Sequence, residues 1–286
     1  MTQKIILNIK CLDQMGIVAD VTRFLYDSDF NIIESTQFND ANSKQFFMRI
    51  EAENLKADID DLTRYLAETF YNIANKYNIE FTFYDANKPI RTLLMVSKLD
   101  HCLEDVLHRY RLNSLNIEIT SIVSNHLNAK RIADFNNLPF HHLPISKDTK
   151  DQQEAKLRKI IENENAGLII LARYMQILSD KISAEYSGRI INIHHSFLPS
   201  FKGARPYHQA YGRGVKIIGA TAHYVTKDLD EGPIIEQDIE HITHAMVPKE
   251  LIAIGRDIER RVLSRAIRHH TEHRIIIDEN RTIILR

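Results

Sequence analysis

The chain is poor in the features that would tie it to an oxidising compartment, a metal or a nucleic acid. Only two of its 286 residues are cysteines, Cys11 and Cys102, and they form no CxxC pair. A disulfide framework or a zinc site normally needs more cysteines at characteristic spacings, so neither is expected. The formal net charge of −1 offers no general attraction for nucleic acid or for an anionic membrane.

Long apolar runs and low-complexity tracts are also missing. No run approaches the length of a membrane span, and Met1–Lys4 lead directly into an alternating, strand-like segment rather than a secretory signal. We therefore expect a cytoplasmic protein without a membrane partner. Apolar residues make up 44% of the chain and charged residues 26%, which is the balance of a globular protein of one large or two ordinary domains.

The first 85 residues contain two kinds of hydrophobic pattern. Period-two alternation predicts strands at 4–11, 31–38, 44–52 and 79–84, and helical spacing predicts helices at 17–26 and about 55–76. The resulting order is βαββαβ. This order is typical of a ferredoxin-like fold, in which one sheet is covered by two helices.

This half resembles an ACT domain. The resemblance rests on Asp13–Ala19, Asn31–Glu34 and Phe46–Arg49. It implies that two such domains pair, so a homo-oligomer is expected, and that a small amino-acid effector binds between them. The effector would contact the backbone at Gly16 and the residues Asp13, Ile17 and Asn31. The alternative is a domain that only dimerises, with Asp13 as the cap of the first helix.

A polar segment with a proline, Asp85–Pro89, separates this pattern from the rest of the chain. We therefore expect a first domain at 1–85, a linker at 86–90 and a second domain at 91–286. In the second domain strands alternate with helices, which predicts an open, mostly parallel α/β sheet. Ligands of such sheets bind outside the carboxyl ends of the strands.

Polar groups gather near two of these strand ends. Asn192 and His194 alternate on a short apolar strand, so their side chains are expected on one face of the sheet. Asp230 lies in the loop after the next strand, Lys216–Val225. An amide, an imidazole and a carboxylate brought together in this way are suited to acyl transfer.

The second domain resembles the folate-dependent formyltransferases, the fold used by phosphoribosylglycinamide and methionyl-tRNA formyltransferases. Within that fold the match is closest to the formyltetrahydrofolate deformylases, which carry an ACT domain in front. The matching stretches are Ala172–Ser179, Asn192–Pro199, His223–Val225 and Leu229–Gln237. The resemblance implies that Asn192, His194 and Asp230 are catalytic. It also implies a folate pocket lined by Met175, Gln176, Ile177, Leu178, Val225, Thr226 and Leu229.

The reaction implied is hydrolysis of 10-formyltetrahydrofolate to formate and tetrahydrofolate, with the formate used in purine synthesis. Asn192 would donate a hydrogen bond to the oxyanion, and a protonated His194 would be a second donor. Asp230 would hold the attacking water and accept its proton, with His223 as a supporting residue. No metal or other cofactor is required by this scheme.

The alternative within enzymes is formyl transfer to an amine. The resembling transferases hold the phosphate of their amine substrate on a glycine-rich loop after the first strand, whereas the same place here, Ser97–Cys102, has no glycine. Asp100 would also repel a phosphate, so water is the expected nucleophile. An alternative of another class is a sensor that binds an amino acid or folate without catalysis, and the intact Asn192, His194 and Asp230 argue against it.

The remaining histidines carry weaker signals. His195, His208 and His223 suggest a metal cluster at first sight, but their spacing fits no helical ligand pair and no cysteine completes it. Structural roles are expected instead. His101 and His142 could approach the side where a transferase holds its amine. The arginines of the last helix are expected to form a solvated or interface face: Arg256, Arg260, Arg261, Arg265 and Arg268.

Overall fold

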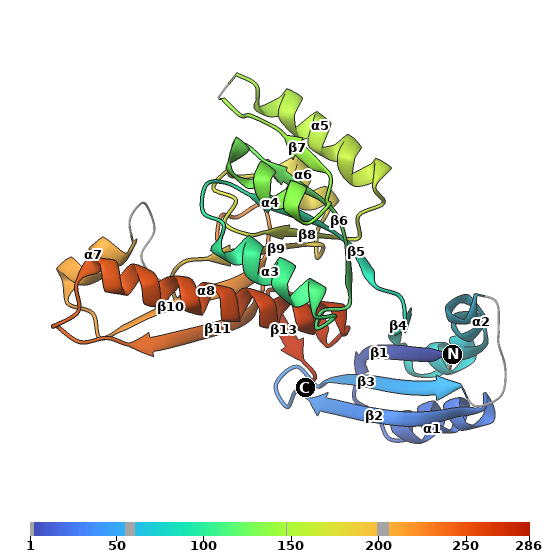
Figure 1. The fold of residues 1–286 in the computed structure, drawn as a ribbon. Helices are drawn as coiled ribbons and strands as arrows, with labels where there is room; N and C mark the ends of the chain where they lie inside the picture. The colour runs from blue at the N-terminus through green and yellow to red at the C-terminus, as the bar shows by residue number, and fades with distance from the viewer. Residues whose placement is uncertain (1–2, 55–60, 147, 199–205) are drawn as a thin grey trace. The chain divides into compact units, whose positions relative to one another are not determined.

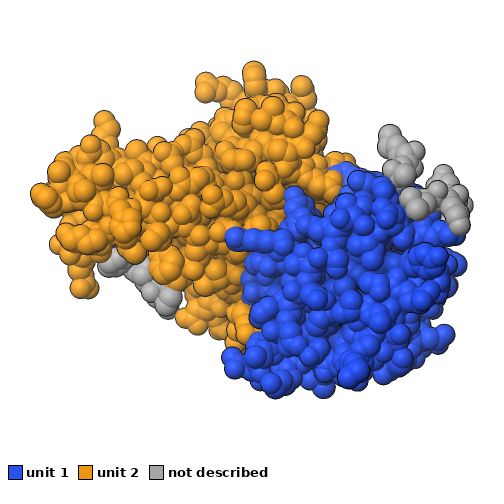
Figure 2. All heavy atoms as spheres, turned by 90° about the horizontal axis from the view of Figure 1, so that it is seen from below, with its two compact units in different colours: residues 1–89, 272–278, 282–286 blue, residues 90–271, 279–281 orange. Residues whose placement is uncertain are grey.

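The structure is a computed structural model that describes residues 3–54, 61–146, 148–198 and 206–286. The chain divides into two compact units (Figure 2). The first contains Met1–Pro89, Glu272–Asp278 and Thr282–Arg286, and the second contains Ile90–Thr271 and Glu279–Arg281. The expected beginning of the second helix at residues 55–60 and most of the expected loop at 197–203 lie outside the described residues.

The first unit is a four-stranded sheet with two helices (Figure 1). Its strands are β1 (Lys4–Leu12), β2 (Phe30–Asn39), β3 (Gln45–Asn54) and β4 (Glu80–Asp85), and its helices are α1 (Ile17–Asp27) and α2 (Leu62–Tyr77). The strand order β2-β3-β1-β4 with antiparallel neighbours confirms the ferredoxin-like prediction.

Alternation along β1 divides the buried side chains between the two faces of this sheet. Ile5, Leu7 and Ile9 belong to the same core as Leu25 of α1 and Phe70 of α2. Since successive side chains of a strand point to opposite faces, the residues between them face away from the helices. One face of the sheet is therefore an apolar layer under both helices.

The opposite face packs against the end of the chain, a hairpin of β12 (Ile275–Asp278) and β13 (Arg281–Ile284). Lys10 Nζ lies 3.1 Å from Asp278 Oδ1, and Asn8 Nδ2 donates to the His273 carbonyl at 2.9 Å. The sequence analysis assigned this segment to the second domain. That assignment is corrected for most of residues 272–286, because their polar partners lie on the sheet of the first unit.

The second unit is built on a seven-stranded sheet in the order β11-β10-β9-β8-β5-β6-β7. The parallel strands are β5 (Ile90–Val96), β6 (Ile117–Ser124), β7 (Phe140–His142), β8 (Leu168–Leu171) and β9 (Ile190–His194). Two antiparallel strands, β10 (Ile217–Tyr224) and β11 (Ile234–His241), extend one edge. The predicted open and mostly parallel sheet is confirmed.

Helices connect these strands. They are α3 (His101–Arg111), α4 (Lys130–Phe135), α5 (Lys150–Asn163), α6 (Asp180–Glu185), α7 (Pro206–Arg213) and α8 (Pro248–Thr271). The two short helices α6 and α7 were not predicted. Because β5, β8 and β9 are parallel neighbours, the loops after them meet at one edge of the sheet. No helix among the described residues is both long and apolar enough to cross a membrane.

Candidate active site

Two neighbouring strands position the polar groups of the site. Asn192 and His194 lie on β9, and the antiparallel register places His223 of β10 directly opposite Asn192. The pairing of β10 with β11 shifts register between Ala222 and His223. Such bulges are common beside active sites because they change the direction of a side chain.

Asp230 joins these residues from the loop that follows β10. Its Oδ1 lies 3.2 Å from His194 Nδ1 and 3.7 Å from His223 Nε2. His223 Nδ1 donates to the Tyr224 carbonyl at 2.9 Å, and its Nε2 lies 3.2 Å from Asn192 Nδ2. The structure thus brings together the residues that the sequence analysis named as catalytic, with His223 beside them.

The carboxylate is held in its charged form. Burial alone would raise the pKa of Asp230, but hydrogen bonds and charges from His194 and His223 outweigh burial and hold that pKa well below its usual range. His195 behaves in the opposite way: burial, followed by the charges of Arg173 and His194, lowers the pKa of His195 to about 4. At neutral pH the site therefore combines an ionised Asp230 with a neutral His195.

One ring nitrogen of His194 is left for a ligand. Its Nδ1 faces Asp230, whereas its buried Nε2 has no hydrogen-bond partner among the described residues. A buried polar atom without a partner is costly unless a bound molecule satisfies it. Because His194 also lines the cavity of the site, Nε2 is the atom expected to meet the reacting group.

The cavity has a volume of about 230 Å³ and joins these polar groups to an apolar wall. Large apolar side chains of that wall are unusually exposed: Met175 at 55%, Ile177 at 60% and Leu229 at 57%. Exposed apolar surface beside convergent polar groups marks a small-molecule site. The lining includes every residue expected to contact folate: Met175, Gln176, Ile177, Leu178, Val225, Thr226 and Leu229.

Buried polar side chains hold in place the segment after β8 that forms part of the cavity wall. Ser97 Oγ accepts from the Met175 backbone at 2.9 Å, and Gln153 Nε2 donates to the Tyr174 hydroxyl at 3.1 Å. Glu154 accepts from both the backbone and the hydroxyl of Ser179. Both Gln153 and Glu154 are buried, so the wall is pre-organised by α5 rather than left to a free loop.

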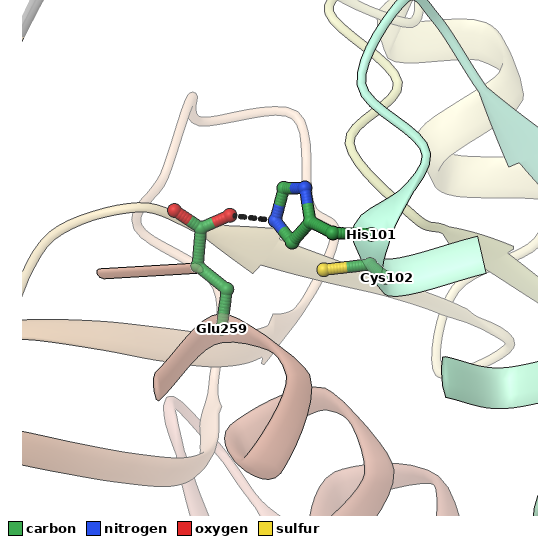
Figure 3. Close-up of side chains that lie close together, drawn as sticks. All are labelled: His101, Cys102 and Glu259. Atoms are coloured by element: carbon green, nitrogen blue, oxygen red, sulfur yellow. Dashed lines mark hydrogen bonds and ion pairs between the residues drawn. The ribbon is translucent and has the colours of Figure 1, made fainter. Parts of the chain in front are cut away.

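A second group of titratable side chains lies behind the cavity wall: His101 and Cys102 from α3 and Glu259 from α8 (Figure 3). Their ligand atoms lie within 4.8 Å of one another, as a metal centre would require. However, Glu259 Oε2 lies 2.7 Å from His101 Nε2 and 3.4 Å from Arg173 Nε, and Oε1 accepts from the Tyr207 hydroxyl at 2.7 Å.

These contacts favour an ion-pair network over a metal centre. Burial, followed by the charge of Glu259, raises the pKa of Cys102 well above its usual value, which disfavours the thiolate that a metal would bind. The guanidinium of Arg173 beside Glu259 would also repel a cation. The histidines first considered for a metal play other parts: His223 and His195 line the cavity, and His208 is exposed on α7.

The sequence analysis assigned no role to Arg173 or Glu259. A signal was present in each case. Arg173 is a cation that directly follows the apolar run 167–172, and Glu259 lies next to Ile258 and one turn before Val262 and Leu263, which are buried on α8. A carboxylate on the apolar stripe of a helix indicates a buried partner.

The residues expected to bind an effector do not all face solvent. The Ile17 side chain is only 1% exposed and belongs to the core, so only its backbone could contact a ligand. Asp13 accepts from Asn39, and the cap of α1 is Gly16, so the alternative role of Asp13 as a helix cap is wrong. Gly16 has φ +98°, and a Cβ there would lie 2.8 Å from the Tyr77 hydroxyl oxygen. This conformation and this close approach require glycine.

Comparison with known proteins separates two groups of relatives. A sequence model of the formyl transferase family matches residues 90–267. The formyltetrahydrofolate deformylase of Corynebacterium sp. (strain P-1) is 44% identical over 281 residues, covering 98% of this chain and 98% of the relative.

Solved structures give the same division. The formyltetrahydrofolate deformylase of Burkholderia mallei has a TM-score of 0.92 at 44% identity, covering 99% of this chain and 100% of that one. Glycinamide ribonucleotide transformylase 1 of Symbiobacterium toebii has a TM-score of 0.66 at 27% identity and covers 71% of this chain and 97% of that one. Since these deformylases match nearly the whole chain at 44% identity, the chain belongs to the formyltetrahydrofolate deformylase family.

Proposed function

We propose that the protein hydrolyses 10-formyltetrahydrofolate to formate and tetrahydrofolate. The observation that carries this proposal is the shared cavity, in which Asn192, His194 and Asp230 meet an apolar wall suited to a pterin ring. The near-full-length likeness to proteins named formyltetrahydrofolate deformylase supports it. In the cell the formate would be used in purine synthesis and the reaction would balance the one-carbon folate pools.

The first step is attack of water on the formyl carbon. Asp230 Oδ1 is engaged by both imidazoles, which leaves Oδ2 to orient the water and receive its proton. Because the pKa of Asp230 is held low, the carboxylate is a weak base, and the proton moves only as the carbon–oxygen bond forms. The C=O bond becomes a tetrahedral oxyanion.

The oxyanion is stabilised by hydrogen-bond donors. Asn192 Nδ2 is one donor, and His194 Nε2 is the second when it carries a proton. Asp230 orients the imidazole through Nδ1, as the carboxylate does in a hydrolytic triad. The proton then passes to N10, the C–N10 bond breaks, and formate and tetrahydrofolate leave. No step in this scheme calls for a metal.

The experiment is turnover of 10-formyltetrahydrofolate without any added amine, with formate and tetrahydrofolate measured together. We expect equal amounts of both products from the parent protein, and a loss of about 10³-fold or more in Asp230→Asn. Glu231→Gln is the matched control, because it removes the charge of the adjacent, exposed carboxylate. Formyl transfer to an amine with no release of formate would overturn the proposal.

The first unit is proposed to pair with a second copy and to bind a small amino acid near the Gly16 backbone, Asp13 and Asn31. Asp13 and Asn31 are exposed, and Asn31 Nδ2 lies 3.5 Å from Glu53 Oε1, so these polar groups are available to a ligand. A calorimetric titration with single amino acids, repeated on Asp13→Ala, tests this site. The unpaired, buried Cys11 and Cys102 suit the cytoplasmic location that we propose.

A further inference from the structure

We propose that a buried charged plug beside the active site excludes amines, so that water is the only nucleophile to reach the formyl group. The plug consists of Glu259, His101, Arg173 and Tyr207. The proposal rests on the function proposed above and adds the residues that separate hydrolysis from formyl transfer. These residues come from α8, α3, the loop after β8 and α7.

The plug is held by internal contacts on both oxygens of Glu259, although the buried Arg173 Nε has no hydrogen-bond partner among the described residues. The Glu259 side chain is 1% exposed and accepts from His101 and Tyr207, each at 2.7 Å, with Arg173 Nε at 3.4 Å. Burial would raise the pKa of Glu259, but His101 and Arg173 lower it below its usual range, so the carboxylate is charged. A buried charge with this many partners holds its neighbours in one arrangement.

A glycine on the helix that carries Glu259 leaves room for Tyr207. Gly255 lies one turn before Glu259 on α8, and a Cβ on Gly255 would lie 2.1 Å from the Tyr207 hydroxyl oxygen. Any side chain at this position would therefore displace the phenol ring. The absence of a side chain leaves a notch through which Tyr207 reaches Glu259, which indicates a site shaped for this contact rather than an accidental ion pair.

Arg173 connects the plug to the cavity. Its backbone has φ +65°, a conformation that non-glycine residues adopt only when the surroundings enforce it. Its side chain is 8% exposed and lines the cavity together with His195, whose ring centroid lies 6.5 Å from that of Tyr207. The end of the cavity beside His195 is therefore closed by Arg173, with the rest of the plug behind it.

The plug occupies the side on which a second substrate would have to bind. The loop after β5, which holds the phosphate of the amine in the resembling transferases, ends here at His101, whose ring turns inward to Glu259 (Figure 3). The cavity volume of about 230 Å³ is below the roughly 300–1,000 Å³ typical of small-molecule sites. At its His195 end the space beside the folate is bounded by Arg173.

Both reactions are balanced without any further reagent. In hydrolysis a C–O bond to water forms, the C–N10 bond breaks, one water proton moves to N10, and the other is released to solvent as formic acid ionises to formate. In transfer a C–N bond to the amine forms, the same C–N10 bond breaks, and an amine proton moves to N10. The two outcomes differ only in which nucleophile reaches the carbon, and this is the choice that the plug controls.

The test is the molar ratio of formylglycinamide to formate when glycinamide is supplied at high concentration with 10-formyltetrahydrofolate. The main variant is Arg173→Gly/Glu259→Gln. It removes the two charges of the buried Arg173–Glu259 pair together, and glycine accepts the positive φ of residue 173. We expect a ratio close to the detection limit from the parent protein and one at least about tenfold above that limit in the variant.

The ratio is independent of the fraction of folded protein, so a merely structural effect would not change it. Arg158→Ala/Glu185→Gln is the matched control, since it removes another ion pair of the second unit, with Nε and Oε2 2.8 Å apart, and its ratio should equal that of the parent. Arg173→Gly alone is read in the same way if the double variant does not fold. An unchanged ratio with formate still released overturns the plug, whereas no formate from the parent overturns the proposed function.

Discussion

Two carboxylates of the second unit have similar partners but differ in whether a ligand in the cavity can reach them. Asp230 contacts His194 and His223, and Glu259 contacts His101, with Arg173 as an additional cation. In both, histidine partners outweigh burial and hold the pKa of the carboxylate below its usual range. Asp230, however, lines the cavity, whereas Glu259 has both oxygens occupied and a side chain that is 1% exposed.

The comparison shows that charge and partners alone do not identify a catalytic carboxylate. One oxygen of Asp230 contacts the two imidazoles, and the carboxylate also lines the cavity, where a ligand can reach it. Asp230 can therefore take part in the reaction. Both oxygens of Glu259 contact neighbouring side chains. These contacts hold α3, α7 and the loop after β8 against α8. We expect substitutions to separate the two: those at Asp230 should affect turnover, and those around Glu259 should affect stability and the choice of nucleophile.

The largest expected stability effect is that of Glu259→Ala. It leaves Arg173 buried without its carboxylate, and breaking a buried ion pair in this way costs about 3–5 kcal/mol. Asp230→Ala should cost much less, because Asp230 lies at the cavity and solvent can enter. Urea unfolding of both variants at neutral pH measures the difference, and equal losses would contradict the contrast between the two carboxylates.

Asn192→Ala should reduce kcat by about 10²–10³-fold with little change in KM, because it removes one oxyanion donor. The loss should appear without a comparable loss of stability. Asn163→Ala, at an exposed position at the end of α5, serves as the control and should keep full activity. A KM effect larger than the kcat effect would instead assign Asn192 to folate binding.

Gly255→Ala should destabilise the protein by about 1–3 kcal/mol, the usual cost of overpacking, because the added Cβ would overlap Tyr207. In the background of Tyr207→Ala the same substitution should cost almost nothing. Gly212→Ala on α7 is the control, because a Cβ there meets nothing within 4 Å. A double-mutant cycle with no coupling between positions 255 and 207 would show that the missing side chain of Gly255 is not what admits Tyr207.

The last prediction concerns the pH dependence of stability, and it has no effect at neutral pH. The pKa values of His195 and His270 are lowered to about 4, mainly by burial. The unfolded chain therefore binds protons near pH 6.5 before the folded protein does, so stability is complete above pH 6.5 and falls between pH 6.5 and 4. A shift of this size corresponds to roughly 3 kcal/mol for each imidazole across this pH window, and His270→Gln should make the fall shallower.

The sequence predicted best what depends on short-range periodicity. Alternation alone placed Asn192 and His194 on one face of β9, and the succession of strands and helices predicted the open α/β sheet. The position of Asp230 followed from the family resemblance, because no period links a loop residue to a strand many residues earlier. The bulge at His223 and the positive φ of Arg173 depend on tertiary contacts that no local pattern encodes.

Other features were missed because their sequence signals compete. Glu259 lies among arginines on α8, which favoured the interpretation of a solvated face, although its own neighbours on the helix are apolar. The short helices α6 and α7 span 6 and 8 residues, too few for a helical period to stand out. Most of the segment after Thr271 was assigned to the wrong unit, because its partners lie at the other end of the chain.

The location of that hairpin has a consequence for the order of synthesis. A ribosome completes β1 to β4 early, but the polar face around Asn8, Lys10 and the buried Arg49 receives its cover only when the last residues emerge. Domains generally fold from the N-terminus as they are made, yet here the first unit is finished last. A nascent chain that stops after Thr271 would therefore carry a complete catalytic sheet and an unfinished first unit. The last residues of the chain are therefore needed to complete the first unit.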